Sequence, residues 1–114
     1  MKDWKAVEAF ALSLPDTEAG TTYGKPAVKL NGKMLIATTA PDPASFVVHA
    51  PTDEKAVLMD TDPETFWQTP HYDGWPAVLV RYASTDPERV RNVIRRAWWD
   101  RASRAQRAAF GERP

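Results

Sequence analysis

The sequence contains no cysteine among its 114 residues. This absence excludes a disulfide framework, a thiolate zinc site and a thiol nucleophile. Long hydrophobic runs are also missing, because the longest unbroken apolar stretches have four residues, as at Met34–Ala37 and Ala77–Val80. A membrane-spanning helix needs about 20 apolar residues, and three of residues 2–5 are already charged, unlike the apolar stretch of a signal peptide. We therefore expect a cytoplasmic protein that makes no contact with a membrane.

Arginine is missing from the first two thirds of the chain. Residues 1–76 carry six lysines and eleven acidic residues, a net charge of −5, whereas residues 77–114 carry nine arginines and four acidic residues, a net charge of +5. Such a split either marks a nucleic-acid or membrane partner or lets two halves attract each other within one fold. The length is typical of one domain, so we expect a single domain over residues 1–114.

Four segments have the pattern of β-strands, with apolar side chains bounded by turn residues. The strongest local signal is Asn31-Gly32 between two of these segments. Both residues tolerate the positive φ of a type I′ turn, and they therefore predict a hairpin. The predicted strands are Ala27–Leu30, Lys33–Thr38, Ser45–Ala50 and Ala77–Tyr82.

Helices are predicted on both sides of these strands. In the first, apolar residues at positions 4, 7, 10, 11 and 14 form one stripe, and Pro15 ends the helix. Later starts are predicted from capping side chains and early prolines. Thr52 starts a helix that runs through Met59, and Asp62-Pro63-Glu64 starts the next one. Asp86-Pro87-Glu88 starts a helix that runs to about Asp100, and Ser103 with Gln106 starts the last one. The order of elements predicts an α+β fold, with an antiparallel sheet and helices packed on one face.

A set of short motifs follows a fixed order over roughly residues 4–110. The motifs are Leu14-Pro15, Tyr23-Gly24-Lys25-Pro26-Ala27-Val28-Lys29, Asn31-Gly32-Lys33, Thr69-Pro70-His71-Tyr72, Gly74-Trp75-Pro76-Ala77-Val78-Leu79-Val80-Arg81 and Ala97-Trp98. This ordered set resembles the MmcQ/YjbR family. The resemblance implies an α+β domain, with an N-terminal helix and a long C-terminal helix, of a kind compared with a double-wing DNA-binding domain. Its members are commonly labelled DNA-binding, and it supplies no catalytic residues. The landmark positions are Gly24, Pro26, Lys29, Gly32, Lys33, His71, Trp75 and Arg81.

The long C-terminal helix carries the strongest candidate for a binding surface. Steps of 100° per residue place its apolar side chains on one arc and a basic group with Trp99 on the other. A basic face that contains an aromatic ring suits phosphate contacts and base stacking. Alternatively, Trp99 packs against the last helix or a second subunit with an arginine on its ring, and the arginine stems cover apolar surface. The basic arc comprises Arg89, Arg91, Asn92, Arg95, Arg96 and Trp99.

Two smaller features also have two interpretations. Lys29 and Lys33 flank the hairpin turn. In one interpretation the hairpin is a wing whose lysines contact nucleic-acid phosphates, and in the other the lysines only prevent the strand edge from pairing with another chain. His71 lies near Asp73, an arrangement available to a general base, but no nucleophile accompanies it, and the ring equally suits holding an irregular loop in place. His49 is the sole other histidine, and no spacing of histidines and carboxylates predicts a metal site.

The sequence thus predicts a DNA-binding module that uses the arginine-rich helix and the hairpin wing, with no cofactor or metal. The alternative is a protein-interaction or small-ligand-binding domain without catalytic activity, which accounts equally well for the tryptophans and the zero net charge. An enzyme is disfavoured because a nucleophile, a metal site and a cofactor motif are all missing. The candidate nucleic-acid-binding residues are Lys29, Lys33, Arg81, Arg91, Arg95, Arg96 and Trp99.

Overall fold

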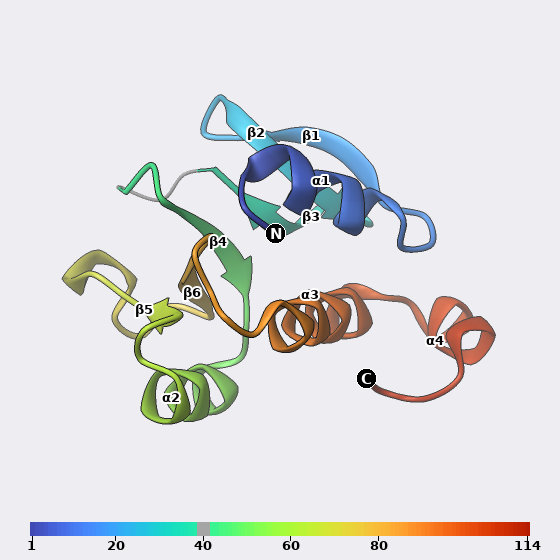
Figure 1. The fold of residues 1–114 in the computed structure, drawn as a ribbon. Coiled ribbons are helices and arrows are strands. Elements are labelled where there is room, and N and C mark those ends of the chain that lie inside the picture. Colours follow the sequence, from blue (N-terminus) through green and yellow to red (C-terminus); the bar gives the residue numbers. More distant parts are fainter. Residues whose placement is uncertain (39–41) are drawn as a thin grey trace.

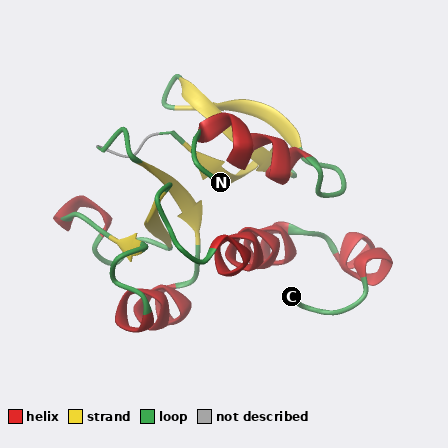
Figure 2. Cartoon of the chain, in the orientation of Figure 1, coloured by secondary structure: helices red, strands yellow, loops and turns green. Residues whose placement is uncertain are grey.

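The computed structural model describes residues 1–38 and 42–114, which form an α+β fold (Figures 1 and 2). Its six strands make one antiparallel sheet in the order β1-β2-β3-β4-β6-β5. The elements in chain order are α1 Trp4–Leu12, β1 Glu18–Thr22, β2 Lys25–Leu30, β3 Lys33–Ala37, β4 Ser45–His49, α2 Thr52–Thr61, β5 Phe66–Trp67, the 3₁₀ helix η1 Pro70–Tyr72, β6 Ala77–Arg81, α3 Pro87–Arg101 and α4 Arg104–Phe110.

Three helices bury one face of the sheet. Val28, Ile36, Val48 and Val78 lie opposite one another across four neighbouring strands, and all four are fully buried. They share one hydrophobic core with residues of α1, α2 and α3. Figure 1 shows α1 beside β2 and β3, with α3 below α1 and next to β4. The predicted fold class is therefore confirmed.

The long helix α3 begins and packs as its sequence predicts. The side chain of Asp86 accepts a hydrogen bond from the backbone N–H of Arg89 at 3.1 Å, and Pro87 occupies the first turn. Its buried face consists of the apolar arc expected from the 3.6-residue repeat. These buried residues are Val90, Val93, Ile94, Ala97 and Trp98.

One predicted helix is absent and a strand stands near its place. The prediction that Asp62-Pro63-Glu64 opens a helix is wrong. Asp62 instead ends α2, and its carbonyl accepts hydrogen bonds from the backbone N–H groups of Thr65 and Phe66. Phe66 then enters β5, pairs with Val80 and is 1% exposed. Burial of this aromatic ring outweighs the local preference for a helix start, because burying a large apolar side chain contributes more free energy than helix propensity does.

The strand β1 and its turn to β2 were not among the predicted elements. Tyr23 and Gly24 have φ of 52° and 75°, the left-handed values of a two-residue hairpin turn, and Thr22 pairs with Lys25 across it. Most of the β1 side chains are exposed. An exposed edge strand lacks the apolar alternation by which strands are recognised in a sequence.

The Asn31-Gly32 turn has the predicted geometry, with φ of 53° and 77°. Replacing Gly32 with valine is expected to lower the free energy of unfolding by about 1–2 kcal/mol, because a β-branched residue resists positive φ. A Cβ at this position would meet no heavy atom within 4 Å, so the cost comes from the backbone alone. Urea denaturation of the wild type, Gly32→Val and Gly32→Asn measures it. Asparagine tolerates positive φ, so equal losses in both variants would contradict the explanation.

Candidate functional site

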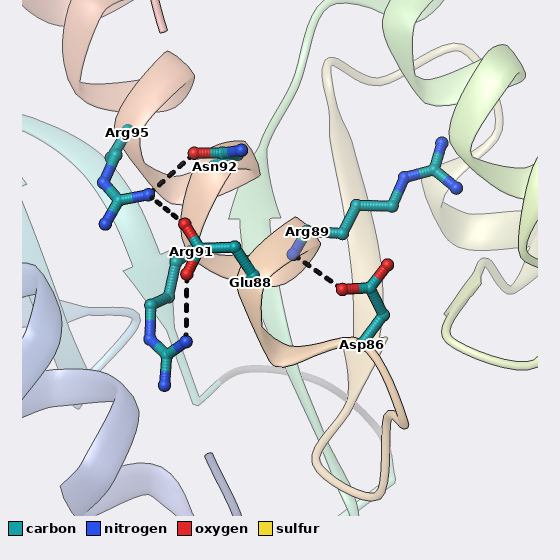
Figure 3. Close-up of polar contacts among 6 residues, drawn as sticks. All are labelled: Asp86, Glu88, Arg89, Arg91, Asn92 and Arg95. Carbon is teal, nitrogen blue, oxygen red and sulfur yellow. Dashed lines mark hydrogen bonds and ion pairs between the residues drawn. The ribbon is translucent and has the colours of Figure 1, made fainter.

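The arginines on the outer side of α3 are partnered within the chain, and Figure 3 shows two of them, Arg91 and Arg95, beside Glu88. Glu88 lies between two of them, with its carboxylate oxygens 3.1 Å from Nη1 of Arg91 and 2.9 Å from Nη1 of Arg95. Hydrogen bonds from Arg95 and Arg91 lower the pKa of Glu88 below its ordinary value. Arg95 also donates to the Asn92 amide oxygen at 2.7 Å. This part of the helix is a network of ion pairs.

Two further arginines of α3 contact α2. Arg96 pairs with Glu54, and both side chains are largely buried, at 21% and 17% exposed. Arg89 donates a hydrogen bond to the Thr61 hydroxyl at 2.6 Å, and its guanidinium lies 5.6 Å from the centre of the Phe66 ring. These side chains therefore join two helices.

Trp99 packs under the last helix. Its ring meets Phe110 at a centroid distance of 6.2 Å, and the Arg107 guanidinium lies 5.4 Å from the ring centre. Arg107 also donates from Nε to the Trp99 carbonyl at 2.9 Å. The packing alternative for Trp99, against the last helix with an arginine on its ring, is confirmed.

The Asn31-Gly32 tip is docked on the C-terminal helices. The Asn31 amide donates to the Arg101 carbonyl at 3.0 Å and to the Gln106 side-chain oxygen at 2.9 Å. Lys33 is exposed beside this tip, and Lys29 is half-buried with its stem against Gly20. The hairpin tip that extends from the sheet without such contacts is Tyr23-Gly24, where Tyr23 is 91% exposed.

Arg81 lies at the other end of the sheet from Lys33. Its guanidinium sits 4.8 Å from the centre of the Trp67 ring and donates to the carbonyls of Pro63 and Glu64. Because β3 and β6 run in the same direction, the start of β3 and the end of β6 are at opposite ends. The predicted nucleic-acid-binding residues therefore lie in three separate places: the hairpin, the end of β6 and α3.

The face of the sheet turned away from the main core carries a row of aliphatic side chains. Ala27, Ala37, Val47 and Leu79 follow one another in register across β2, β3, β4 and β6, and each is buried. They alternate with the residues of the main core and so point to the opposite face.

A pocket of about 820 Å³ opens over this second face. One wall is the β1–β2 turn and the other is the segment from Thr69 to Trp75, which includes η1. Because the lining comes from five separate segments, only the folded chain brings it together. The lining residues are Thr22, Tyr23, Lys25, Met34, Val47, Thr69, His71, Tyr72, Trp75 and Ala77.

Aromatic rings dominate the walls of this pocket, which we call the aromatic pocket. The rings of His71 and Trp75 are nearly parallel, at 13° and a centroid distance of 6.4 Å, and Tyr72 meets His71 edge-on at 5.0 Å. Trp75 is 58% exposed and Tyr23 is 91% exposed. Two large, exposed rings on the rim of a concave surface are a feature of binding sites, where aromatic residues supply much of the contact.

Lys55 holds the loop that forms one wall. Its ammonium donates to the carbonyl of Tyr72 at 2.6 Å and to that of Trp75 at 3.0 Å, from a side chain that is almost fully buried. Burial lowers the pKa of Lys55. A lysine of α2 therefore anchors this loop, and His71 contributes ring contacts to Tyr72 and Trp75 within it.

The second histidine, His49, lies outside this pocket. His49 is 8% exposed, and burial followed by the charge of Arg101 lowers its pKa. Among residues 1–38 and 42–114, no three His, Asp or Glu side chains gather as a metal ion would require. No described helix is both long and apolar enough to span a bilayer.

Sequence reasoning identified only part of the aromatic pocket. It named His71 and Trp75 as landmarks of a resemblance and not as a site. Tyr23, Met34 and Val47 were missed as binding residues. The available signal was the pair of aromatic residues next to turn glycines, Tyr23-Gly24 and Gly74-Trp75, since large rings in turns have little core to fill.

Comparisons with known proteins agree with this fold. A family model described as YjbR matches residues 12–99. The chain is 29% identical over 91 residues to the uncharacterized proteins Mb2600 of Mycobacterium bovis and Rv2570 of Mycobacterium tuberculosis, covering 77% of this chain and 70% of each relative. The crystal structure of Deinococcus radiodurans protein DR2400, a DUF419 domain, superimposes with a TM-score of 0.73 at 15% identity, covering 97% of this chain and 89% of that one. The chain belongs to the YjbR family.

Proposed function

We propose that this domain binds a small, flat organic ligand in the aromatic pocket. The observation that carries the proposal is the pair of exposed rings, Tyr23 and Trp75, on either side of a hollow with an apolar floor. Leaving such rings in water forgoes the free energy of burial, about 25 cal/mol per Å² of apolar surface, which a ligand between them would recover. The volume of about 820 Å³ fits the range of small-molecule sites, roughly 300–1,000 Å³.

The DNA-binding hypothesis has less support from the contacts. Arg91, Arg95 and Arg96 each have a carboxylate partner, and the ring of Trp99 is packed under α4. Binding phosphates there would require breaking these ion pairs, which offsets the gain from counterion release. We therefore favour the small-ligand alternative over the arginine surface.

The test uses naphthalene carboxamide, a flat and uncharged probe. We expect it to shift the Trp75 indole N–H resonance and the Val47 and Ala77 methyl resonances, with a dissociation constant on the order of 1 mM for a fragment of this size. Trp75→Ala should weaken binding at the pocket by about tenfold, as loss of one stacking ring does. Val57→Ser, which alters an exposed apolar side chain of α2 outside the pocket, is the matched control and should leave binding unchanged.

Two outcomes would count against the proposal. One is a probe that shifts resonances of α3 or α4 and leaves the pocket residues alone. The other is salt-sensitive binding of duplex DNA that is lost in the triple variant Arg91→Gln, Arg95→Gln, Arg96→Gln, which would return the function to the arginine surface. Because these arginines join helices, the melting temperature of that variant must be measured first.

A further inference from the structure

We infer that the ligand of the aromatic pocket is an anion, a flat aromatic carboxylate, and that Lys25 selects it; this rests on the proposed function. Lys25 begins β2 directly after the Tyr23-Gly24 turn. It is the one formally charged residue in the described lining of the pocket. The remaining residues of the lining are aromatic, aliphatic or polar without formal charge. The charge that the site offers a ligand is therefore positive.

The ammonium of Lys25 is available to a ligand. Its side chain is exposed and makes no ion pair or hydrogen bond with residues 1–38 or 42–114. Asp3 and Asp42 share the lining of an adjoining hollow with Lys25, but neither pairs with it: Asp3 accepts a hydrogen bond from the Ala6 N–H and Asp42 from the Ala44 N–H, both at 2.9 Å. Lys55, the other lysine near the pocket, is committed to two carbonyls. Lys25 thus has an unmet charge beside an apolar hollow.

The surroundings strengthen an ion pair at this position. An apolar wall reduces screening, so a carboxylate beside Lys25 gains more than a fully solvated surface pair would. The ligand's ring would lie among Tyr23, His71 and Trp75, with its carboxylate directed to the rim. A nucleic-acid strand would need several cations along its path, whereas this pocket offers one. The single charge therefore favours a small monoanion.

The experiment compares naphthalene carboxylate with naphthalene carboxamide, which share a ring system and differ in charge. The Trp75 indole N–H shift gives both dissociation constants. We expect the wild type to bind the carboxylate about fivefold more tightly, the size of a partly screened ion pair. Lys25→Met should bring this ratio close to one, and Lys25→Arg should retain it. Lys33→Gln, an exposed lysine outside the pocket, should leave the ratio unchanged.

Added salt supplies a second readout. Raising NaCl from about 20 mM to about 500 mM should weaken binding of the carboxylate and leave that of the carboxamide unchanged, because only the former has an ion pair to screen. Equal affinities for the two probes at the pocket would overturn the role of Lys25 and leave the proposed function standing. If neither probe moves the Trp75 resonance, both the inference and the proposed function fail. If a single-stranded oligonucleotide shifts the same resonances and binds more tightly than naphthalene carboxylate, the inference that the ligand is a small monoanion is wrong.

Discussion

Replacing Trp98 with alanine is expected to lower the free energy of unfolding by about 3–5 kcal/mol, the usual cost of removing a large aromatic side chain from a core. Trp98 is fully buried and its ring packs on Phe110 at a centroid distance of 4.8 Å. Its indole N–H donates to the Pro15 carbonyl at 2.7 Å. The alanine variant would therefore lose the ring, leave a cavity and lose the hydrogen bond to the Pro15 carbonyl.

Two variants separate these contributions. Trp98→Phe keeps much of the ring and loses the N–H, so we expect a loss of about 1–3 kcal/mol from the lost hydrogen bond and the smaller side chain. Trp75→Ala makes the same chemical change at an exposed position and should alter stability by about 0.5 kcal/mol or less. Urea denaturation monitored by far-ultraviolet circular dichroism measures all three. Similar losses in Trp98→Ala and Trp75→Ala would contradict the placement of Trp98.

The features predicted correctly from the sequence are those that local chemistry determines. Asp86-Pro87 starts α3 through its own side chains, and the positive φ of Asn31-Gly32 is a property of those two residues. The capping box of Ser103 and Gln106 is likewise local and is present at the start of α4. The apolar arc of α3 is buried as predicted because its periodicity is a property of the helix itself.

The features that were missed depend on contacts between distant residues. Asp62 carries the same start signal as Asp86, yet Phe66 is drawn into the sheet by pairing with Val80, and no local pattern reveals this. The arginine arc was placed correctly on α3, but nothing in that segment shows that Glu54, 42 residues away, neutralises Arg96.

The aromatic pocket was beyond local reasoning for the same cause. Its floor at Met34 and Val47 and its walls at Tyr23 and Trp75 come from segments that only the sheet brings together. The family resemblance marked Gly24 in one turn and His71 and Trp75 in the other as landmark positions. Their function as opposite rims of one hollow follows from the order of the strands.

Replacing Lys55 with methionine is expected to release the pocket wall while leaving the fold largely intact. The two carbonyls of the loop, at Tyr72 and Trp75, would lose charge-assisted hydrogen bonds worth about 1.5–3 kcal/mol each before desolvation is counted. In the wild type, burial of the ammonium costs free energy that partly offsets these hydrogen bonds, as the lowered pKa of Lys55 indicates. An apolar side chain of similar length removes that cost, so we expect a net loss of global stability below about 2 kcal/mol.

The local effect of Lys55→Met should be much larger than the global one. The backbone N–H groups of Tyr72, Asp73 and Trp75 are hydrogen-bonded within the loop itself. We expect their hydrogen exchange to accelerate by about 10- to 100-fold, because they open with the loop and not with the whole domain. The hydrogen-exchange rates of amides in β4, in the centre of the sheet, should rise only by the factor that the loss of global stability accounts for. Lys25→Met, which removes an exposed ammonium beside the same pocket, is the matched control and should leave these rates unchanged. Equal acceleration in the loop and in β4 would show that Lys55 supports the whole fold and not the wall of the pocket.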